Sequence, residues 1–129
     1  MQGGDAVQVT FGGGFRPLES RDGAYIHYRR APNSSDLWRI PTSGGPPINL
    51  LERGCEHFSV VDKGIYCLEE TSRDAALRFL DLSSSRSSIV ARGLGRTPYL
   101  FTASRDGRTI LYSRIDSAVE DLMLVENFK

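Results

Sequence analysis

The tetrapeptide Ser20-Arg21-Asp22-Gly23 returns unchanged as Ser104-Arg105-Asp106-Gly107, and each copy leads into a short run of β-branched and aromatic residues. Between the copies, Val61-Asp62-Lys63-Gly64 opens a similar run, so an Asp marks the chain at 22, 62 and 106, in steps of 40 and 44 residues. A fixed period of this length is typical of solenoids, propellers and other repeat arrays. The chain is therefore predicted to contain three repeated units.

The shared tetrapeptide has a structural explanation that requires no ligand. Gly tolerates the positive φ of a tight turn, and an Asp side chain accepts hydrogen bonds from nearby backbone amides. We therefore interpret both copies as turn markers that precede a strand.

Each unit contains short extended runs separated by turn residues. The runs are 14–18, 24–28, 37–40 and 48–51 in the first unit, 57–61, 65–68, 77–82 and 88–91 in the second, and 98–101, 109–112 and 122–125 in the third. The spacing between the second and third runs is eleven residues in the first unit and twelve in the other two. No helical period is sustained, so the predicted fold class is all-β.

Four short antiparallel strands in about forty residues make one blade of a β-propeller. The chain is therefore predicted to be a single propeller segment over 1–129. Residues 6–52 would hold an outer strand and the first blade, 53–93 the second blade, and 94–129 a third blade that lacks its outer strand.

The residues of the units also resemble the WD40-like (PD40) repeats of bacterial TolB-type propellers, over nearly the whole chain. The resemblance is carried by the Ser-x-Asp-Gly turn, the apolar strand, and then Asp36-Leu37-Trp38-Arg39-Ile40 followed by Gly44-Gly45. The family's usual Pro in the turn is Arg21 or Arg105 here. The middle unit departs further, because its turn is shorter and Ser83-Ser84-Ser85 stands where Gly is expected.

The two ends of the chain are predicted to be complementary. Residues 6–11 match the outermost strand of a blade, and that strand is absent after the third unit. Three blades cannot close a ring, since closed rings need about four to eight, and an open arc leaves apolar faces and strand edges exposed. Either two chains form a six-bladed homodimer, with residues 6–11 pairing with 121–126 of the partner, or the chain is part of a larger propeller. We favour the homodimer for the isolated chain, with a strand-exchange interface of Val7, Val9, Phe11, Leu122 and Leu124.

Charge and hydropathy restrict the classes of partner. The 129 residues carry 16 basic and 16 acidic side chains, so the large basic surface of a nucleic-acid-binding protein is absent. No run approaches the roughly twenty apolar residues of a membrane helix. We expect no nucleic-acid or membrane partner, while the compartment, periplasmic or cytoplasmic, stays open.

The two cysteines allow two interpretations. Cys67 lies in an apolar strand-like run and Cys55 in the approach to the same unit, so a disulfide is geometrically conceivable. Ordinary buried thiols explain the positions as well, and we favour them. No zinc-ligand spacing is present, so no metal site is expected.

We expect no catalytic residue and no cofactor. The chain lacks the Gly-x-Ser-x-Gly pentapeptide of serine hydrolases, and Gly12-Gly13-Gly14 is followed neither by Gly-Lys-Ser/Thr nor by a helix. His27, His57, Arg29 and Arg30 are candidates for a central channel or its rim. Trp38 is expected to pack between blades.

The resemblance to TolB-type propellers implies a role in binding proteins, peptides or ligands without catalysis. Fold analogy carries this step, and the same fold serves many functions. The alternative is a sensory or accessory propeller of a larger regulatory or hydrolytic protein.

Overall fold

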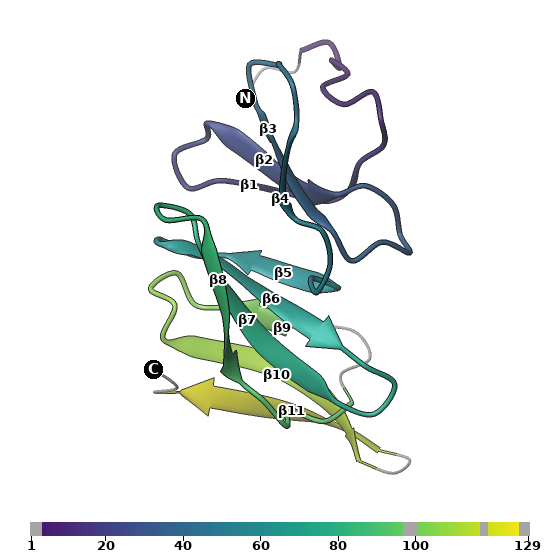
Figure 1. The fold of residues 1–129 in the computed structure, drawn as a ribbon, viewed down its shortest axis with the longest axis vertical. Coiled ribbons are helices and arrows are strands. Elements are labelled where there is room, and N and C mark those ends of the chain that lie inside the picture. Colours follow the sequence, from purple (N-terminus) through teal and green to yellow (C-terminus); the bar gives the residue numbers. More distant parts are fainter. Residues whose placement is uncertain (1–3, 97–100, 117–118, 127–129) are drawn as a thin grey trace.

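The computed structural model describes residues 4–96, 101–116 and 119–126, which form three antiparallel sheets stacked along the long axis (Figure 1). The first sheet contains β1 (Phe15–Glu19), β2 (Tyr25–Arg29), β3 (Leu37–Pro41) and β4 (Ile48–Leu51). The second contains β5 (His57–Val60), β6 (Gly64–Glu70), β7 (Ala75–Asp81) and β8 (Arg86–Ala91). The third contains β9 (Phe101–Ala103), β10 (Thr109–Asp116) and β11 (Val119–Glu126). The all-β prediction is confirmed.

Each sheet is a meander in which strands that follow one another in sequence pair with one another. The third sheet has three strands within the described residues, and residues 98–100 of the run predicted at 98–101 lie outside them. Contacts between β1 and β5, and between β5 and β9, place the first strands of successive sheets side by side. This is how the inner strands of propeller blades are arranged. No helix in the described part of the chain is long and apolar enough to cross a membrane.

The two Ser-Arg-Asp-Gly turns have the same hydrogen bonds. In the first, Asp22 Oδ1 accepts from Ser20 Oγ at 2.7 Å and from the Ala24 amide at 3.0 Å. The equivalent bonds to Asp106 Oδ1 measure 2.7 Å and 3.0 Å. The glycine of each turn has a φ of 73°. These bonds lower the pKa of both carboxyl groups and confirm the interpretation of the tetrapeptide as a turn marker.

The turn of the middle unit is built differently. It closes with a 2.9 Å hydrogen bond from the Val61 amide to the Gly64 carbonyl, and Gly64 does not adopt a positive φ. Gly64 is buried, and a Cβ there would overlap the Leu80 carbonyl oxygen and lie 2.8 Å from Phe79 Cζ. Glycine is needed here for the close approach of two strands. In the same sheet, Ser85 has a φ of 60° where the repeat pattern expects Gly.

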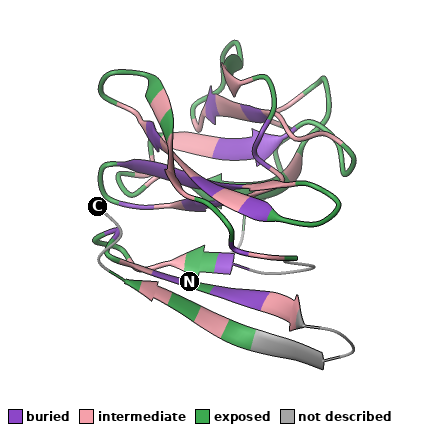
Figure 2. Cartoon of the chain, turned by 60° about the horizontal axis from the view of Figure 1, so that its bottom comes forward, coloured by how far each residue is buried: buried purple, intermediate pink, exposed green. Residues whose placement is uncertain are grey.

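Apolar side chains pack between neighbouring sheets, and buried residues lie on the strands in the interior of the molecule (Figure 2). In the second sheet they are on β5, β6 and β7, whereas β8 has none. One cluster joins the first and second sheets and consists of Leu37, Cys55, Phe58, Ile65, Cys67 and Leu80. The other joins the second and third sheets and consists of Val61, Tyr66, Leu68, Ala75, Leu77, Leu94, Phe101, Ile110 and Tyr112. The second sheet therefore contributes opposite faces to two cores.

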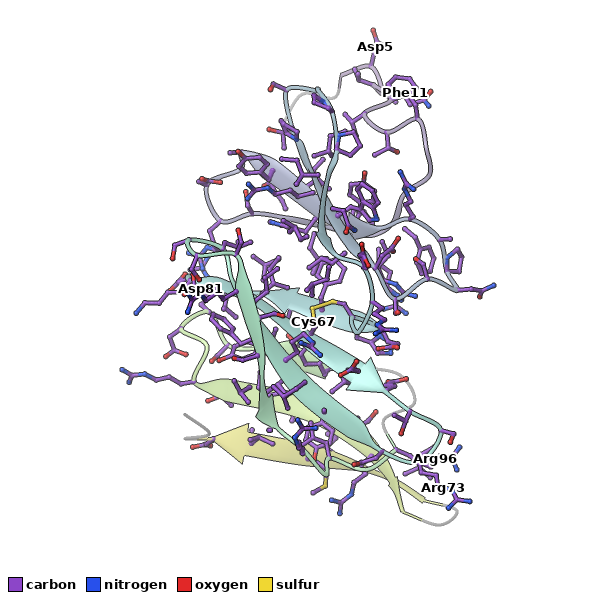
Figure 3. The ribbon with its side chains drawn as sticks, viewed as in Figure 1. Asp5, Phe11, Cys67, Arg73, Asp81 and Arg96 are labelled. Atoms are coloured by element: carbon purple, nitrogen blue, oxygen red, sulfur yellow. A yellow bond between two sulfur atoms is a disulfide. The ribbon has the colours of Figure 1, made fainter. Side chains whose placement is uncertain are left out.

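Cys55 and Cys67 form a disulfide, so the preference for free thiols was wrong. Both residues are fully buried, and Figure 3 shows the bond beside Cys67 in the middle of the molecule. Cys55 lies between β4 and β5, and Cys67 lies on β6. The bond therefore fixes the connection between the first two sheets to the interior of the second.

The segment before β1 differs from the sequence prediction. Residues 6–11 form no strand in the isolated chain. Val9, Thr10 and Phe11 instead border a small cavity of about 150 Å³, together with Tyr28 and Ile40 on the outward face of the first sheet. A strand needs a partner edge, and the prediction placed that edge on a second chain or on further blades of a larger propeller.

Candidate binding site between the first two sheets

A cavity of about 330 Å³ lies between the first and second sheets, and we call it the inter-sheet cavity. The turn after β1 and the turn after β5 border it, while β2 and β3 contribute side chains from their strands. Its apolar walls come from Tyr25, Val60, Val61 and Leu82. The cavity thus lies at the end of the sheets where the Asp turns gather.

His27 is the most deeply buried polar side chain of the cavity, with 1% of its surface exposed. Neither ring nitrogen has a hydrogen-bond partner of normal geometry among the described residues. Burial, followed by the positive charge of Arg39, lowers the pKa of His27 to about 4. The Leu18 carbonyl and the Asp22 carboxylate act in the opposite direction but more weakly. His27 is therefore neutral at pH 7.

Arg39 lies directly across from His27, since the two residues are paired between β2 and β3. Its guanidinium carbon is 4.4 Å from the centre of the Tyr25 ring, a cation–π distance. Its buried Nε has no hydrogen-bond partner among the described atoms. The sequence analysis missed Arg39 as a site residue. The spacing of the second and third strands indicated that the two strands are neighbours, but the pairing of Arg39 with His27 depends on their register.

The rim of the cavity is held by links between the Asp turns. Arg21 Nη1 lies 3.2 Å from Asp62 Oδ1, which joins the turn of the first sheet to that of the second. The Asp62 amide donates to the Arg105 carbonyl at 3.0 Å and extends the row to the third sheet. The side chain of Arg21 and the backbone carbonyl of Arg105 therefore both link a repeated turn to the turn of the second sheet.

The neutral state of His27 makes stability depend on pH. The pKa of His27 is lower in the folded state than in the unfolded state, so the unfolded chain binds more protons between these two values. The contribution of neutral His27 to the free energy of unfolding is therefore fully present above about pH 6.5 and is lost as the pH falls toward 4. Between pH 7.5 and 5 we expect His27 to account for a loss of about 2 kcal/mol. Urea unfolding of the wild type and of His27→Gln at both pH values measures it. Equal pH dependence in both proteins would contradict the assignment.

The other candidates for a channel or rim lie apart from this cavity. Arg29 is buried and donates to the carbonyls of Glu56, Pro32 and Ser34, so it holds a loop in place. Burial, followed by the charge of Arg16, lowers the pKa of Arg29.

Arg30 and His57 also have structural contacts. The exposed Arg30 stacks on Trp38 at 4.0 Å from the ring centre, and Trp38 Nε1 donates to Asp36 Oδ2 at 2.9 Å. Tyr28 and Ile40, which alternate with the residues that face the second sheet, share the outward face with Trp38. His57, on β5, has its Nε2 3.3 Å from Glu70 Oε1. Whether any of these residues lines a channel stays a prediction.

The proposed strand-exchange residues lie at opposite ends of the stack (Figure 1). Val7 and Phe11 are 80% and 85% exposed, and Phe11 projects at the end near the N-terminus (Figure 3). Leu122 and Leu124 on β11 are 75% and 58% exposed. The apolar residues before β1 and those on β11 are therefore far apart within one chain. Strand exchange between two chains requires this arrangement.

Comparison with known proteins identifies the architecture. The structure is similar to TolB from Acinetobacter baumannii, with a TM-score of 0.62 and 20% identity over 81% of this chain and 28% of that chain. The three sheets are propeller blades. Hydrazine synthase of Kuenenia stuttgartiensis is also similar (TM-score 0.62, 15% identity, 84% of this chain and 38% of that chain), as is a eukaryotic initiation factor (0.59, 15%, 88% and 30%).

At these identities the likeness concerns the fold, and the chain spans 28 to 38% of the length of the three solved structures. No protein-family model matches the sequence, and no curated protein matches it. Function must therefore be argued from the surfaces and the cavity of the blades.

Proposed function

We propose that this chain is a non-catalytic binding scaffold built from TolB-like blades of the PD40 type, and that it acts as a self-associated propeller. The observation that carries the proposal is the uncovered face of the third blade. Leu111 and Leu124 are cross-strand partners on β10 and β11, and with Leu122 they leave three large apolar side chains between 39% and 75% exposed. Apolar surface of this kind is typical of a protein interface.

A second copy of the chain is the occupant that fits this face. The other end of the stack offers a segment whose Val7 and Phe11 are 80% and 85% exposed, next to the outward face of the first blade, where Tyr28 and Ile40 are buried. Pairing each end with the opposite end of a partner about a two-fold axis gives six blades and covers both faces. Such a ring is within the range of about four to eight blades that closes.

Substitutions on β11 test the association. Leu122→Asp together with Leu124→Asp places two charges in the proposed interface, so we expect the protein to shift from dimer to monomer by light scattering after gel filtration, with at least a tenfold weaker dimer. Deletion of residues 1–11 should weaken the dimer in the same way. Ile48→Asp, at a 46% exposed position on β4, is the control and should remain dimeric. An unchanged dimer in the double variant would contradict the interface.

The absence of catalysis is part of the same proposal. The carboxylates of the repeated turns accept hydrogen bonds from their own turns. Within the described residues, no three His, Cys, Asp or Glu side chains gather as metal ligands would. Among the buried polar groups without a hydrogen-bond partner in the described residues, those of His27 and Arg39 border the inter-sheet cavity and are suited to binding.

A second candidate role is an accessory propeller within a larger regulatory or hydrolytic protein. The observation that favours it is the length of the similar structures, of which the chain spans 28 to 38%. In that case further blades of the same polypeptide would cover the two faces. The buried disulfide supports an oxidising compartment such as the periplasm for either role.

A further inference from the structure

The inter-sheet cavity contains hydrogen-bond donors that the described protein does not use. His27 is 1% exposed, neither ring nitrogen has a hydrogen-bond partner of normal geometry among the described residues, and its neutral ring offers one N–H donor. Arg39, on the facing strand, has a buried Nε without a partner. Buried polar groups are normally paired, so groups that remain unpaired beside a cavity indicate a missing ligand. We propose that the cavity binds a small monocarboxylate with an apolar body, whose carboxylate accepts hydrogen bonds from the Arg39 guanidinium and from one ring N–H of His27.

The negative charges nearby are already engaged, which leaves Arg39 as the cation for the ligand. Asp22 Oδ1 accepts two hydrogen bonds within its own turn, and Asp62 pairs with Arg21. Among the described residues, no carboxylate lies within ion-pair distance of Arg39. A guanidinium matches a carboxylate in a planar, two-pronged geometry, and such charge-assisted bonds are the strong ones.

The walls and rim select the rest of the ligand. Tyr25, Val60, Val61 and Leu82 present apolar surface to the cavity, which suits a hydrocarbon or aromatic body. Asp22 and Asp62 stand at the rim and disfavour a second negative charge, as on phosphate. A volume of about 330 Å³ is at the small end of ligand pockets. These features together indicate one carboxylate on a compact apolar group.

The proposal gives a ligand class to the proposed scaffold but does not depend on self-association, since the cavity lies wholly between two blades of one chain. The Leu122→Asp, Leu124→Asp variant should therefore bind the probe as the wild type does. If the dimer fails and binding persists, only the association is wrong. If the dimer holds and binding is absent, only the ligand site is wrong.

Calorimetric titration of the full chain with benzoate tests the ligand class, with benzamide as the neutral isostere and inorganic phosphate as the dianion. We expect benzoate to bind with a Kd on the order of 1 mM, and benzamide and phosphate to bind at least tenfold more weakly. Equal binding of benzamide would show that the carboxylate is not recognised. Equal binding of phosphate would also overturn the proposal. So would the absence of benzoate binding at about 20 mM, which is 20-fold the expected Kd.

Two further measurements locate the site. Arg39→Gln should weaken benzoate binding at least tenfold, while Arg86→Gln, at an exposed position on β8, should leave it unchanged. Arg39→Gln also removes the stacking on Tyr25, so weaker binding in this variant could come from a change in the cavity wall. NMR of the wild type avoids this ambiguity, because it needs no substitution. Benzoate should shift the NMR signals of the His27 imidazole and leave those of His57 in place. Unshifted His27 signals at saturating benzoate would place the ligand elsewhere and contradict the proposal.

Discussion

Gly64→Ala is expected to lower the free energy of unfolding by about 3 kcal/mol, at the upper end of the usual effect of overpacking. The added Cβ would overlap the backbone oxygen of Leu80 and lie 2.8 Å from Phe79 Cζ. A backbone atom in the middle of a sheet cannot move aside without disturbing the register between β6 and β7. Urea unfolding followed by circular dichroism measures the change.

Gly44→Ala is the matched control for this prediction. Gly44 has a φ of 91°, and a Cβ there would meet nothing within 4 Å. Its substitution carries only the conformational cost of a left-handed backbone, about 1 kcal/mol. If Gly64→Ala were no more destabilising than Gly44→Ala, the close packing of β6 against β7 would be wrong.

Loss of the disulfide is expected to lower the free energy of unfolding by about 3 kcal/mol, from the loop entropy of the cross-linked unfolded chain. The bond closes a loop with a sequence separation of 12 between two fully buried residues. Cys55→Ala together with Cys67→Ala should show the loss in buffer without reductant. The same variant also leaves a small cavity in the core between the first two blades, which adds to the effect.

Unfolding in the presence of a reductant separates the stability contributed by the disulfide from that contributed by the packing of the two cysteine side chains. The wild type should lose stability in a strong reductant, whereas the double alanine variant should unfold at the same urea concentration with and without it. Thiol titration of the unfolded wild type without reductant should find no free thiol. Two free thiols per chain, with stability indifferent to reductant, would contradict the disulfide.

The repeated parts of the fold could be predicted because local chemistry determines them. The Ser-Arg-Asp-Gly turns form from contacts between residues at most five apart, so their sequence is sufficient. The strands that follow were located to within a few residues, since β-branched and aromatic runs between turn residues have few alternatives. Ile48–Leu51 was predicted with its observed bounds.

The parts that could not be predicted depend on contacts between distant residues. Whether Cys55 bonds to Cys67 depends on how the connection after β4 returns to β6, and spacing alone does not determine that path. The burial of Arg29 depends on three carbonyls from a loop and a neighbouring blade. The cavity site needed the register of β2 and β3, which places Arg39 beside His27.

The segment at residues 6–11 is a different case, because its predicted strand requires an edge that one chain does not supply. In the isolated chain it borders the outward face of the first blade instead. The structure of one copy therefore shows the two groups of exposed apolar side chains, at residues 7 and 11 and on β11, but not their pairing. The association must be measured in solution.

Sedimentation equilibrium of the purified chain over micromolar concentrations tests the central claim most directly, namely that three blades are completed by a second copy. One chain has a mass of 14.3 kDa. The proposed six-bladed ring predicts that the average mass rises with concentration toward twice this value and then stays constant, since a closed ring leaves no free face. A stable species of 14.3 kDa across the whole range would contradict the claim.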